Sequence, residues 1–233
     1  MKNDLRAIRV TKNYLKYPEG SCLFQMGNTK VLCTATLSDD VPDHAKEKNQ
    51  GWLTAEYSML PRATTERSQR SRIASGGRTK EISRLIGRSL RAILDLSAMP
   101  EVGIVIDCDV LQADGGTRTA SINGAFIAMI QALRRWRKEG KLAKWPVRDY
   151  VAAVSVGLID HQFFLDLDYE KDVRAEVDMN IVMTGAGDFV EVQGNAEHKP
   201  FSHSDLNKLL AVAGHGIKKI LSIQKKYVGE VAR

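Results

Sequence analysis

The segment from residue 102 to residue 138 limits the possible folds of this chain more than any other part of the sequence. Apolar residues recur in it with a period of two, at Val102, Ile104, Ile106, Cys108 and Val110. This period predicts a strand. The strand runs into Asp114-Gly-Gly116, and a helix is expected from about Thr119 to Lys138. A strand that passes through glycines into a long helix indicates a sheet covered by helices.

The rest of the chain supplies further strands and two more helices. Strands are expected at residues 21–26, 30–37, 52–59, 150–159, 163–167, 178–183 and 189–192. Helices are expected at residues 82–94 and 206–227, the second interrupted by Gly214 and Gly216, and residues 61–80 are expected to form a long polar loop. The order predicts an α+β fold in a single domain, residues 1–233, which could consist of two similar halves without a linker.

The composition is that of a globular protein with a weak attraction for polyanions. Of its 233 residues, 43% are hydrophobic and 27% are charged, and the formal charge of +6 favours nucleic acid only weakly. The three cysteines are far apart among apolar residues, so we expect reduced core thiols. Because no signal peptide or membrane-length apolar run is present, we expect a cytoplasmic protein with no membrane partner.

Two glycine pairs precede helices and are candidate phosphate sites. Gly116, Thr117 and Arg118 could offer backbone amides, a hydroxyl and a guanidinium to an anion. The alternative is a tight turn in which glycine only relieves backbone strain, and the spacing by itself favours this alternative. Ser75-Gly-Gly-Arg78 repeats the pattern, with an ordinary loop end as its alternative. Arg78 and Arg118 could therefore converge on one phosphate.

An acidic segment, residues 165–180, holds the candidate catalytic carboxylates. Asp172 and Asp178 could bind Mg²⁺ or assist proton transfer. In a continuous strand they would lie roughly 20 Å apart, so the chain must reverse between them. The alternative places Asp166 and Asp168 on the solvent side of a strand, with Asp172 and Asp178 flanking a turn.

The basic segment before residue 80 is a candidate RNA contact. Its cations include Arg62, Arg67 and Arg70, and it lacks aromatic residues, so it would follow an RNA backbone rather than stack on bases. A solvated charged loop is the alternative. The five histidines show no spacing that indicates a nucleophile, a base or a metal site.

Six segments spread over nearly the whole chain form a specific set when they are taken in order. They are Asp4-Leu-Arg6, residues 27–35, residues 51–62, residues 76–79, residues 107–121 and Glu191-Val-Gln-Gly194. Together they resemble the ribonuclease PH family of phosphorolytic 3′ exoribonucleases. The resemblance implies a fold of the ribosomal-protein-S5 second-domain type, built of βαβ units, and a homohexamer assembled as a trimer of dimers.

The same resemblance implies an activity and a set of site residues. Inorganic phosphate would bind between Arg78 and the turn formed by residues 116–118, and Asp172 and Asp178 would be the catalytic, Mg²⁺-binding pair. The substrates would be tRNA precursors and other RNA 3′ ends, shortened with release of nucleoside diphosphates, and the reverse reaction would add nucleotides. Two features depart from the family pattern: the segment before Asp4 is only Met1-Lys-Asn3, and Lys171 stands where an acidic residue is common.

Two other functions compete with this interpretation. One is a non-catalytic RNA-binding ring subunit, but such members usually lack some of the site residues that are present here. The other is a hydrolytic, metal-dependent nuclease, in which the phosphate-binding arginines would have no task. The nucleotide released in the presence and absence of phosphate distinguishes the hydrolase from the phosphorolytic enzyme.

Overall fold

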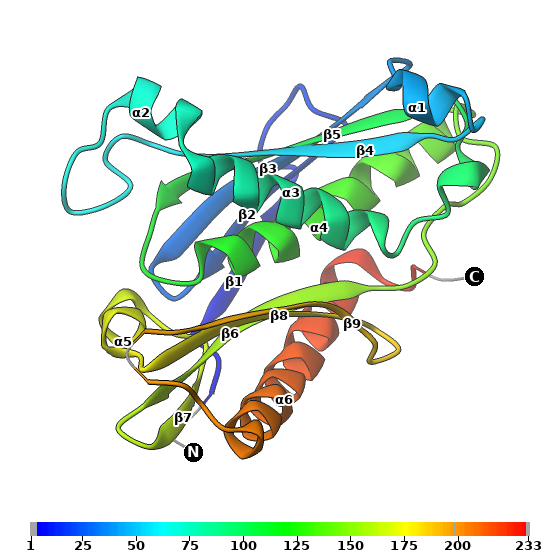
Figure 1. Cartoon of the computed structure of the whole chain (residues 1–233). Helices are drawn as coiled ribbons and strands as arrows, with labels where there is room; N and C mark the ends of the chain where they lie inside the picture. The colour runs from blue at the N-terminus through cyan, green and yellow to red at the C-terminus, as the bar shows by residue number, and fades with distance from the viewer. Residues whose placement is uncertain (1–3, 198, 232–233) are drawn as a thin grey trace.

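The computed structural model describes residues 4–197 and 199–231, and it contains two sheets with a long helix between them (Figure 1). The larger sheet has five strands in the order β1-β2-β3-β5-β4. They span Ile8–Lys12 (β1), Gly20–Met26 (β2), Thr29–Ser38 (β3), Trp52–Met59 (β4) and Gly103–Gln112 (β5). All neighbours are antiparallel except β4 and β5, which are parallel because helical chain connects them.

The smaller sheet is antiparallel, with four strands in the order β7-β6-β8-β9. They span Val151–Ile159 (β6), Gln162–Leu165 (β7), Val177–Thr184 (β8) and Phe189–Ala196 (β9). Every residue of β6 is buried, since the strand is central and has a helix on each face. The hairpins predicted about residues 160–161 and 185–187 are both present.

The helices cover the sheets in layers. They span Asp43–Lys46 (α1), Arg70–Ser75 (α2), Gly77–Arg91 (α3), Thr117–Lys138 (α4), Tyr169–Arg174 (α5) and His203–Val228 (α6), with a 3-10 turn at Leu96–Ala98. The central helix, α4, packs on β2 and β3 and also on β6, whereas α6 covers the other face of the smaller sheet. Asn123 fixes α4 to β6, because its amide both donates to the Ala153 carbonyl and accepts from the Ala153 N–H, each at 2.9 Å.

Two sequence-based expectations about helices were wrong. Residues 61–80 are not a continuous loop, because α2 lies within them and α3 starts at Gly77 rather than near residue 82. The first turn of α3 has no apolar periodicity, so the sequence pattern did not indicate a helix there. The hydroxyl of Thr79 in α3 donates to the Ile73 carbonyl in α2 at 2.8 Å and so links the two helices. Gly214 and Gly216 do not interrupt α6. A Cβ at Gly216 would lie 2.5 Å from the Leu165 side chain, so glycine permits close packing there.

The cysteine expectation is confirmed. Cys22, Cys33 and Cys108 are buried free thiols, and burial raises the pKa of Cys22 to about 12. None of the helices in the described part of the chain is apolar over enough residues to cross a membrane.

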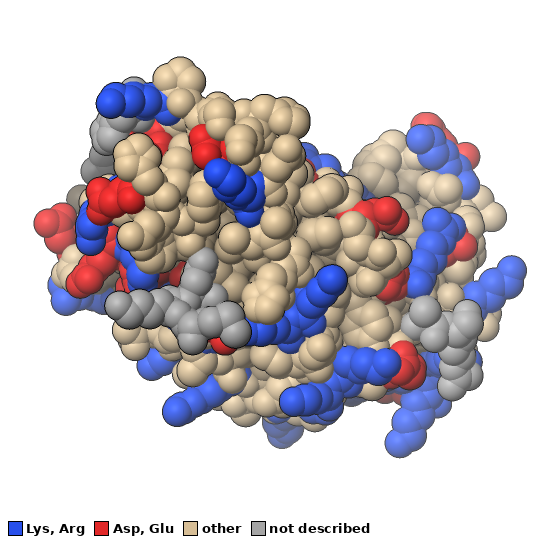
Figure 2. Space-filling view, turned by 90° about the horizontal axis from the view of Figure 1, so that it is seen from below, with Lys and Arg blue, Asp and Glu red and all other residues tan. Residues whose placement is uncertain are grey.

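Basic side chains occur on the face of the molecule that is seen from below (Figure 2). Figure 2, viewed from below, shows Lys and Arg side chains over much of that face, with smaller groups of Asp and Glu between them. The helix α6, which covers the outer face of the smaller sheet, carries four exposed lysines: Lys208, Lys218, Lys225 and Lys226. The positive net charge therefore does not locate a binding site by itself.

Candidate active site

The turn between β5 and α4 leaves the start of a long helix open. Gly115 and Gly116 have φ angles of 70° and 64°, in the left-handed region that favours glycine. A Cβ on Gly115 would also lie 2.4 Å from the Leu167 carbonyl oxygen. No side chain caps the N-terminus of α4. The first amides of the helix are thus available to an anion, and the helix dipole favours a negative charge at this position.

Arg6 braces this turn from the N-terminal segment. Its guanidinium donates to the Asp114 carbonyl at 2.5 Å and to Asp166 Oδ1 at 2.6 Å, where the Asp166 side chain is fully buried. Thr29 adds a 2.6 Å hydrogen bond from its hydroxyl to the Gly115 carbonyl. The alternative that placed Asp166 on the solvent side of a strand is therefore wrong, because Asp166 is the buried partner of Arg6.

Asp114 supports the same turn rather than the chemistry. Its carboxylate accepts hydrogen bonds from the Asn28 amide at 3.1 Å and from the Tyr169 N–H at 3.3 Å. The carboxylate therefore links the β2–β3 turn to the start of α5.

A cavity of about 630 Å³ opens in front of the α4 N-terminus and brings the predicted residues together. Its wall includes all of the predicted phosphate and carboxylate residues: Arg78, Gly116, Thr117, Arg118, Asp172 and Asp178. They come from the starts of α3 and α4, from α5 and from β8. The cavity wall therefore combines two cations and the open amides of α4 with two carboxylates.

The chain reverses direction between Asp172 and Asp178, as the sequence predicted. Asp172 lies in α5 and Asp178 is the second residue of β8, with the end of α5 and a short extended link between them. The Asp168 side chain accepts from the Lys171 N–H at 2.9 Å and so caps α5 at its start. The Lys171 ammonium is paired with the same Asp168 carboxylate, so this unusual lysine is held away from the Asp172 side of α5.

The surroundings of Asp172 and Asp178 raise the pKa of both carboxyl groups. Burial in the cavity wall raises the pKa of Asp172, and Arg78 and Arg118 oppose that shift. Burial also raises the pKa of Asp178, assisted by the nearby charges of Asp172 and Glu197. A cation between the two carboxylates would relieve this repulsion.

Arg118 is held in place with part of its guanidinium unused. One terminal nitrogen, Nη2, lies 2.9 Å from Glu81 Oε2. Its Nε is buried and has no hydrogen-bond partner among the described residues. A buried donor without a partner is costly, so the position of this guanidinium is maintained at the expense of one hydrogen bond.

Sequence reasoning missed Tyr57. This residue of β4 donates a hydrogen bond from its phenol to Thr117 Oγ1 at 2.9 Å, and both side chains are buried. Glu197, Ser155, Asn180 and Asn195 also line the cavity and were not identified from the sequence. The one available signal was that Tyr57 lies in a segment that contributed to the family resemblance.

The donor set fits Mg²⁺ better than a metal held wholly by protein. Within the described residues, no group of three or more His, Cys, Asp or Glu side chains is arranged to hold a metal ion. Two carboxylates facing a phosphate site suffice for Mg²⁺, which keeps several waters and often shares its coordination with substrate phosphates.

The three arginines predicted to contact RNA do not line the cavity. Arg62, Arg67 and Arg70 are exposed on the segment that connects β4 to α2 and on the first residue of α2. That segment leaves the cavity at Thr64, which lines it.

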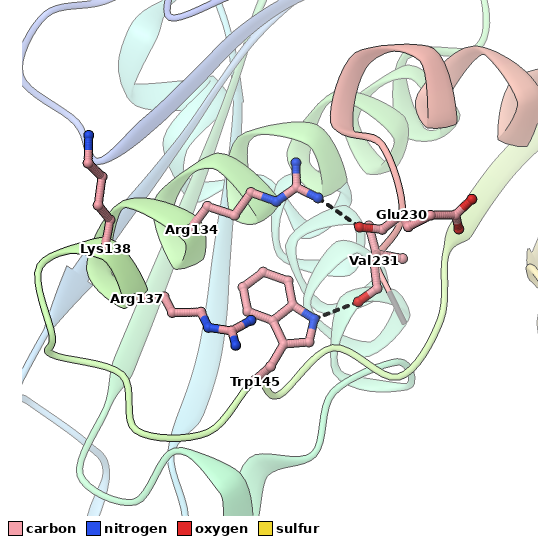
Figure 3. Close-up of a pocket in the computed structure, with 6 residues that line it drawn as sticks. All are labelled: Arg134, Arg137, Lys138, Trp145, Glu230 and Val231. Atoms are coloured by element: carbon pink, nitrogen blue, oxygen red, sulfur yellow. Dashed lines mark hydrogen bonds between the residues drawn. The ribbon is translucent and has the colours of Figure 1, made fainter. Parts of the chain in front are cut away.

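A second cavity, of about 440 Å³, lies at the opposite end of α4 (Figure 3). The C-terminal segment crosses it: Arg134 donates to the Glu230 carbonyl at 2.8 Å, and the Trp145 indole donates to the Val231 carbonyl at 2.5 Å. Arg134 and Trp145 thus help to hold the C-terminal segment in place, and the lining of this cavity lacks a carboxylate pair.

The comparisons with known proteins identify the family of this chain. Residues 4–134 match the model of the 3′ exoribonuclease family, domain 1, and residues 149–216 match that of domain 2. The chain is 51% identical over 231 residues to "Ribonuclease PH" of Moorella thermoacetica, with 98% of this chain and 92% of the relative covered. It is 52% identical over 233 residues to "Ribonuclease PH" of Bacillus cereus, covering 99% and 95%. The chain belongs to the 3′ exoribonuclease family, and it matches both of the family's models.

Solved structures support the fold. Rice Rrp46 superposes with a TM-score of 0.80 at 16% identity, covering 98% of this chain and 97% of that one. The Archaeoglobus fulgidus exosome with RNA bound to the active site gives a TM-score of 0.78 at 19% identity, covering 96% and 89%. The predicted α+β fold class is confirmed.

Proposed function

We propose that this chain is a phosphate-dependent 3′-to-5′ exoribonuclease that trims the 3′ extensions of tRNA precursors. It releases nucleoside diphosphates and, in reverse, adds nucleotides to RNA. One observation carries the proposal: the uncapped N-terminus of α4, the cations Arg78 and Arg118, and the carboxylates of Asp172 and Asp178 line one cavity. The family membership and the relatives named ribonuclease PH support it.

The reaction would start from phosphate bound by Arg78, Arg118, the Thr117 hydroxyl and the amides that follow Gly116. A phosphate oxygen attacks the terminal internucleotide phosphorus, the bond from this phosphorus to the preceding 3′ oxygen breaks, and that oxygen gains a proton. The products are a nucleoside diphosphate and an RNA one nucleotide shorter. The arginines offset the repulsion between the two anions and orient the attacking oxygen.

Asp172 and Asp178 would hold Mg²⁺ on the other side of the cavity. The bound ion would stabilise the charge that develops on the leaving 3′ oxygen. The raised pKa values of both carboxylates fit this role, because a cation favours the charged forms that burial in the cavity wall disfavours.

The remaining parts of the proposal concern the RNA body and the assembly. Arg62, Arg67 and Arg70 would contact phosphates of RNA outside the cavity. Residues 1–233 would act as one domain, in a cytoplasmic homohexamer built as a trimer of dimers. The similarity to exosome subunits supports ring assembly.

The decisive experiment identifies the released nucleotide. The full-length protein is incubated with a 3′-extended RNA and Mg²⁺, with and without inorganic phosphate, and an Asp178→Asn variant serves as the control. We expect nucleoside diphosphates, produced only when phosphate is present. Nucleoside monophosphates formed without phosphate would identify a hydrolase instead, and RNA binding without any cleavage would identify a non-catalytic subunit.

A further inference from the structure

A chain of hydrogen bonds fixes Arg118 from outside the cavity. Glu81 on α3 accepts from Arg118 Nη2 at 2.9 Å through Oε2, and its other oxygen, Oε1, accepts from Gln193 Nε2 on β9 at 3.1 Å. Glu81 is thus held at both oxygens. The three residues come from α4, α3 and β9. These hydrogen bonds therefore connect two helices that lie beside the larger sheet with the edge strand of the smaller sheet (Figure 1).

The orientation of Gln193 indicates that its task is to hold Glu81. Its Oε1 is buried and has no partner among the described residues, while its N–H group is directed at the Glu81 carboxylate. Turning the amide over would place two acceptors against each other. The arrangement therefore leaves one polar atom unsatisfied in order to anchor Glu81, which is a pattern expected of a supporting residue around a functional site.

Glu81 is ionised in this position. Burial acts to raise the pKa of Glu81, but the hydrogen bonds from Arg118 and Gln193 outweigh it and hold the pKa below its ordinary value. A carboxylate so close to a phosphate-binding guanidinium has two opposing effects. It cancels part of the cationic charge and repels phosphate, and it also fixes the direction in which the guanidinium points.

We propose that Glu81 and Gln193 are positioning residues for the phosphate-binding guanidinium of Arg118, an inference that rests on the proposed phosphate site. With Nη2 held by Glu81, the guanidinium of Arg118 is fixed in the cavity wall, and its N–H groups that are not bonded to Glu81 are left to donate to phosphate. The Arg118 side chain is therefore already ordered before phosphate binds, so phosphate binding carries no entropy cost for ordering it. In this arrangement orientation outweighs the cancelled charge.

The experiment measures KM for inorganic phosphate, kcat and RNA affinity in full-length variants. We expect Glu81→Ala and Gln193→Leu to raise KM for phosphate, Glu81→Ala by on the order of 10-fold, with RNA affinity unchanged. Gln193→Glu, which sets a second carboxylate against Glu81, should raise KM as well. Glu81→Gln keeps an acceptor for Arg118 and should stay closer to the wild type.

A matched control lies further along the same two elements. Arg88 on α3 pairs with Glu191 on β9 at 2.8 Å, so Glu191→Ala removes another α3–β9 contact without touching Arg118. This variant should leave KM for phosphate unchanged. In an Arg118→Ala background, Glu81→Ala should add nothing to KM, because the group it positions is already absent.

The outcomes separate the inference from the proposed function. If Arg118→Ala raises KM for phosphate but Glu81→Ala and Gln193→Leu do not, the positioning role is wrong and the phosphate site stands. A lower KM in Glu81→Ala would show that charge cancellation dominates, which also overturns the inference. If Arg118→Ala itself leaves KM for phosphate unchanged, the proposed phosphate site is wrong.

Discussion

Tyr57 and Thr117 form a buried pair in which the tyrosine donates and the threonine accepts, over 2.9 Å. Because the Thr117 oxygen accepts from Tyr57, its own hydrogen is left to donate toward the cavity. Burial raises the pKa of Tyr57, so the phenol keeps the proton that this arrangement needs.

Tyr57→Phe should therefore weaken phosphate binding without affecting RNA. We expect KM for phosphate to rise several-fold and the free energy of unfolding to fall by about 1 kcal/mol, the usual value of one hydrogen bond. Steady-state kinetics and urea unfolding measure the two effects. Tyr150→Phe is the matched control, because its phenol bonds the distant Gly229 carbonyl at 2.6 Å. An equal change of KM in both variants would argue against a specific role for Tyr57.

Arg6→Met should destabilise the protein through the turn that it braces. The change leaves the buried Asp166 carboxylate without its partner, and removal of one member of a buried ion pair costs roughly 3 kcal/mol or more. Urea unfolding at fixed protein concentration measures the destabilisation, and KM for phosphate should rise in the same variant. Lys219→Met, which breaks a surface pair with Asp4, should have a much smaller effect. Comparable destabilisation in the two variants would contradict the bracing role.

Asp178→Asn should abolish activity but stabilise the fold. The pKa of Asp178 is raised above its ordinary value of 3.8 in the folded state, so the charged carboxylate costs stability at any pH above that raised pKa. Without added Mg²⁺, the variant should unfold at a higher urea concentration than the wild type at pH 7. The difference should shrink as the pH is lowered through the raised pKa toward 3.8. Asp188→Asn, on the exposed β8–β9 turn, is the control. If Asp188→Asn stabilised the protein as much as Asp178→Asn does, the raised pKa of Asp178 would not explain the gain.

Removing Arg67 and Arg70 together should weaken RNA binding and leave KM for phosphate unchanged. The salt dependence of RNA binding should become shallower by roughly 0.7 in the logarithmic slope for each RNA phosphate that the variant no longer neutralises. Binding titrations at several salt concentrations give the slope. Replacing Lys218 and Lys226 on α6 removes the same charge from another face and serves as the control. An unchanged slope would mean that this segment is only a solvated charged surface.

Local patterns in the sequence predicted most of the elements and the type of site, but not the contacts that assemble it. The period-two strand and the glycines that follow it were recognisable because neighbouring residues determine them. Gly116 and Arg118 could be proposed for the same reason. The meeting of Arg78 with this turn depends on how α3 and α4 lie against the two sheets; the repeated glycine pattern raised it as a possibility, and the family resemblance favoured it.

The residues that sequence reasoning missed act across the fold. Arg6, Tyr57 and Glu81 reach the site from the N-terminal segment, β4 and α3, and no spacing along the chain relates them to Arg118. The start of α3 escaped notice because its first turn is polar, and Gly216 was taken as a helix breaker because its neighbour Leu165 is distant in sequence.

The order in which the site residues occur along the chain has a consequence for its synthesis. The phosphate-binding arginines and the bracing Arg6 are all translated early, whereas Asp172, Asp178 and Gln193 come from the final third of the chain. A growing polypeptide can thus expose an anion-binding turn long before it possesses carboxylates for the metal. Under the proposed function, the chain would therefore gain its activity only when β8, which carries Asp178, and β9, which carries Gln193, have emerged and paired.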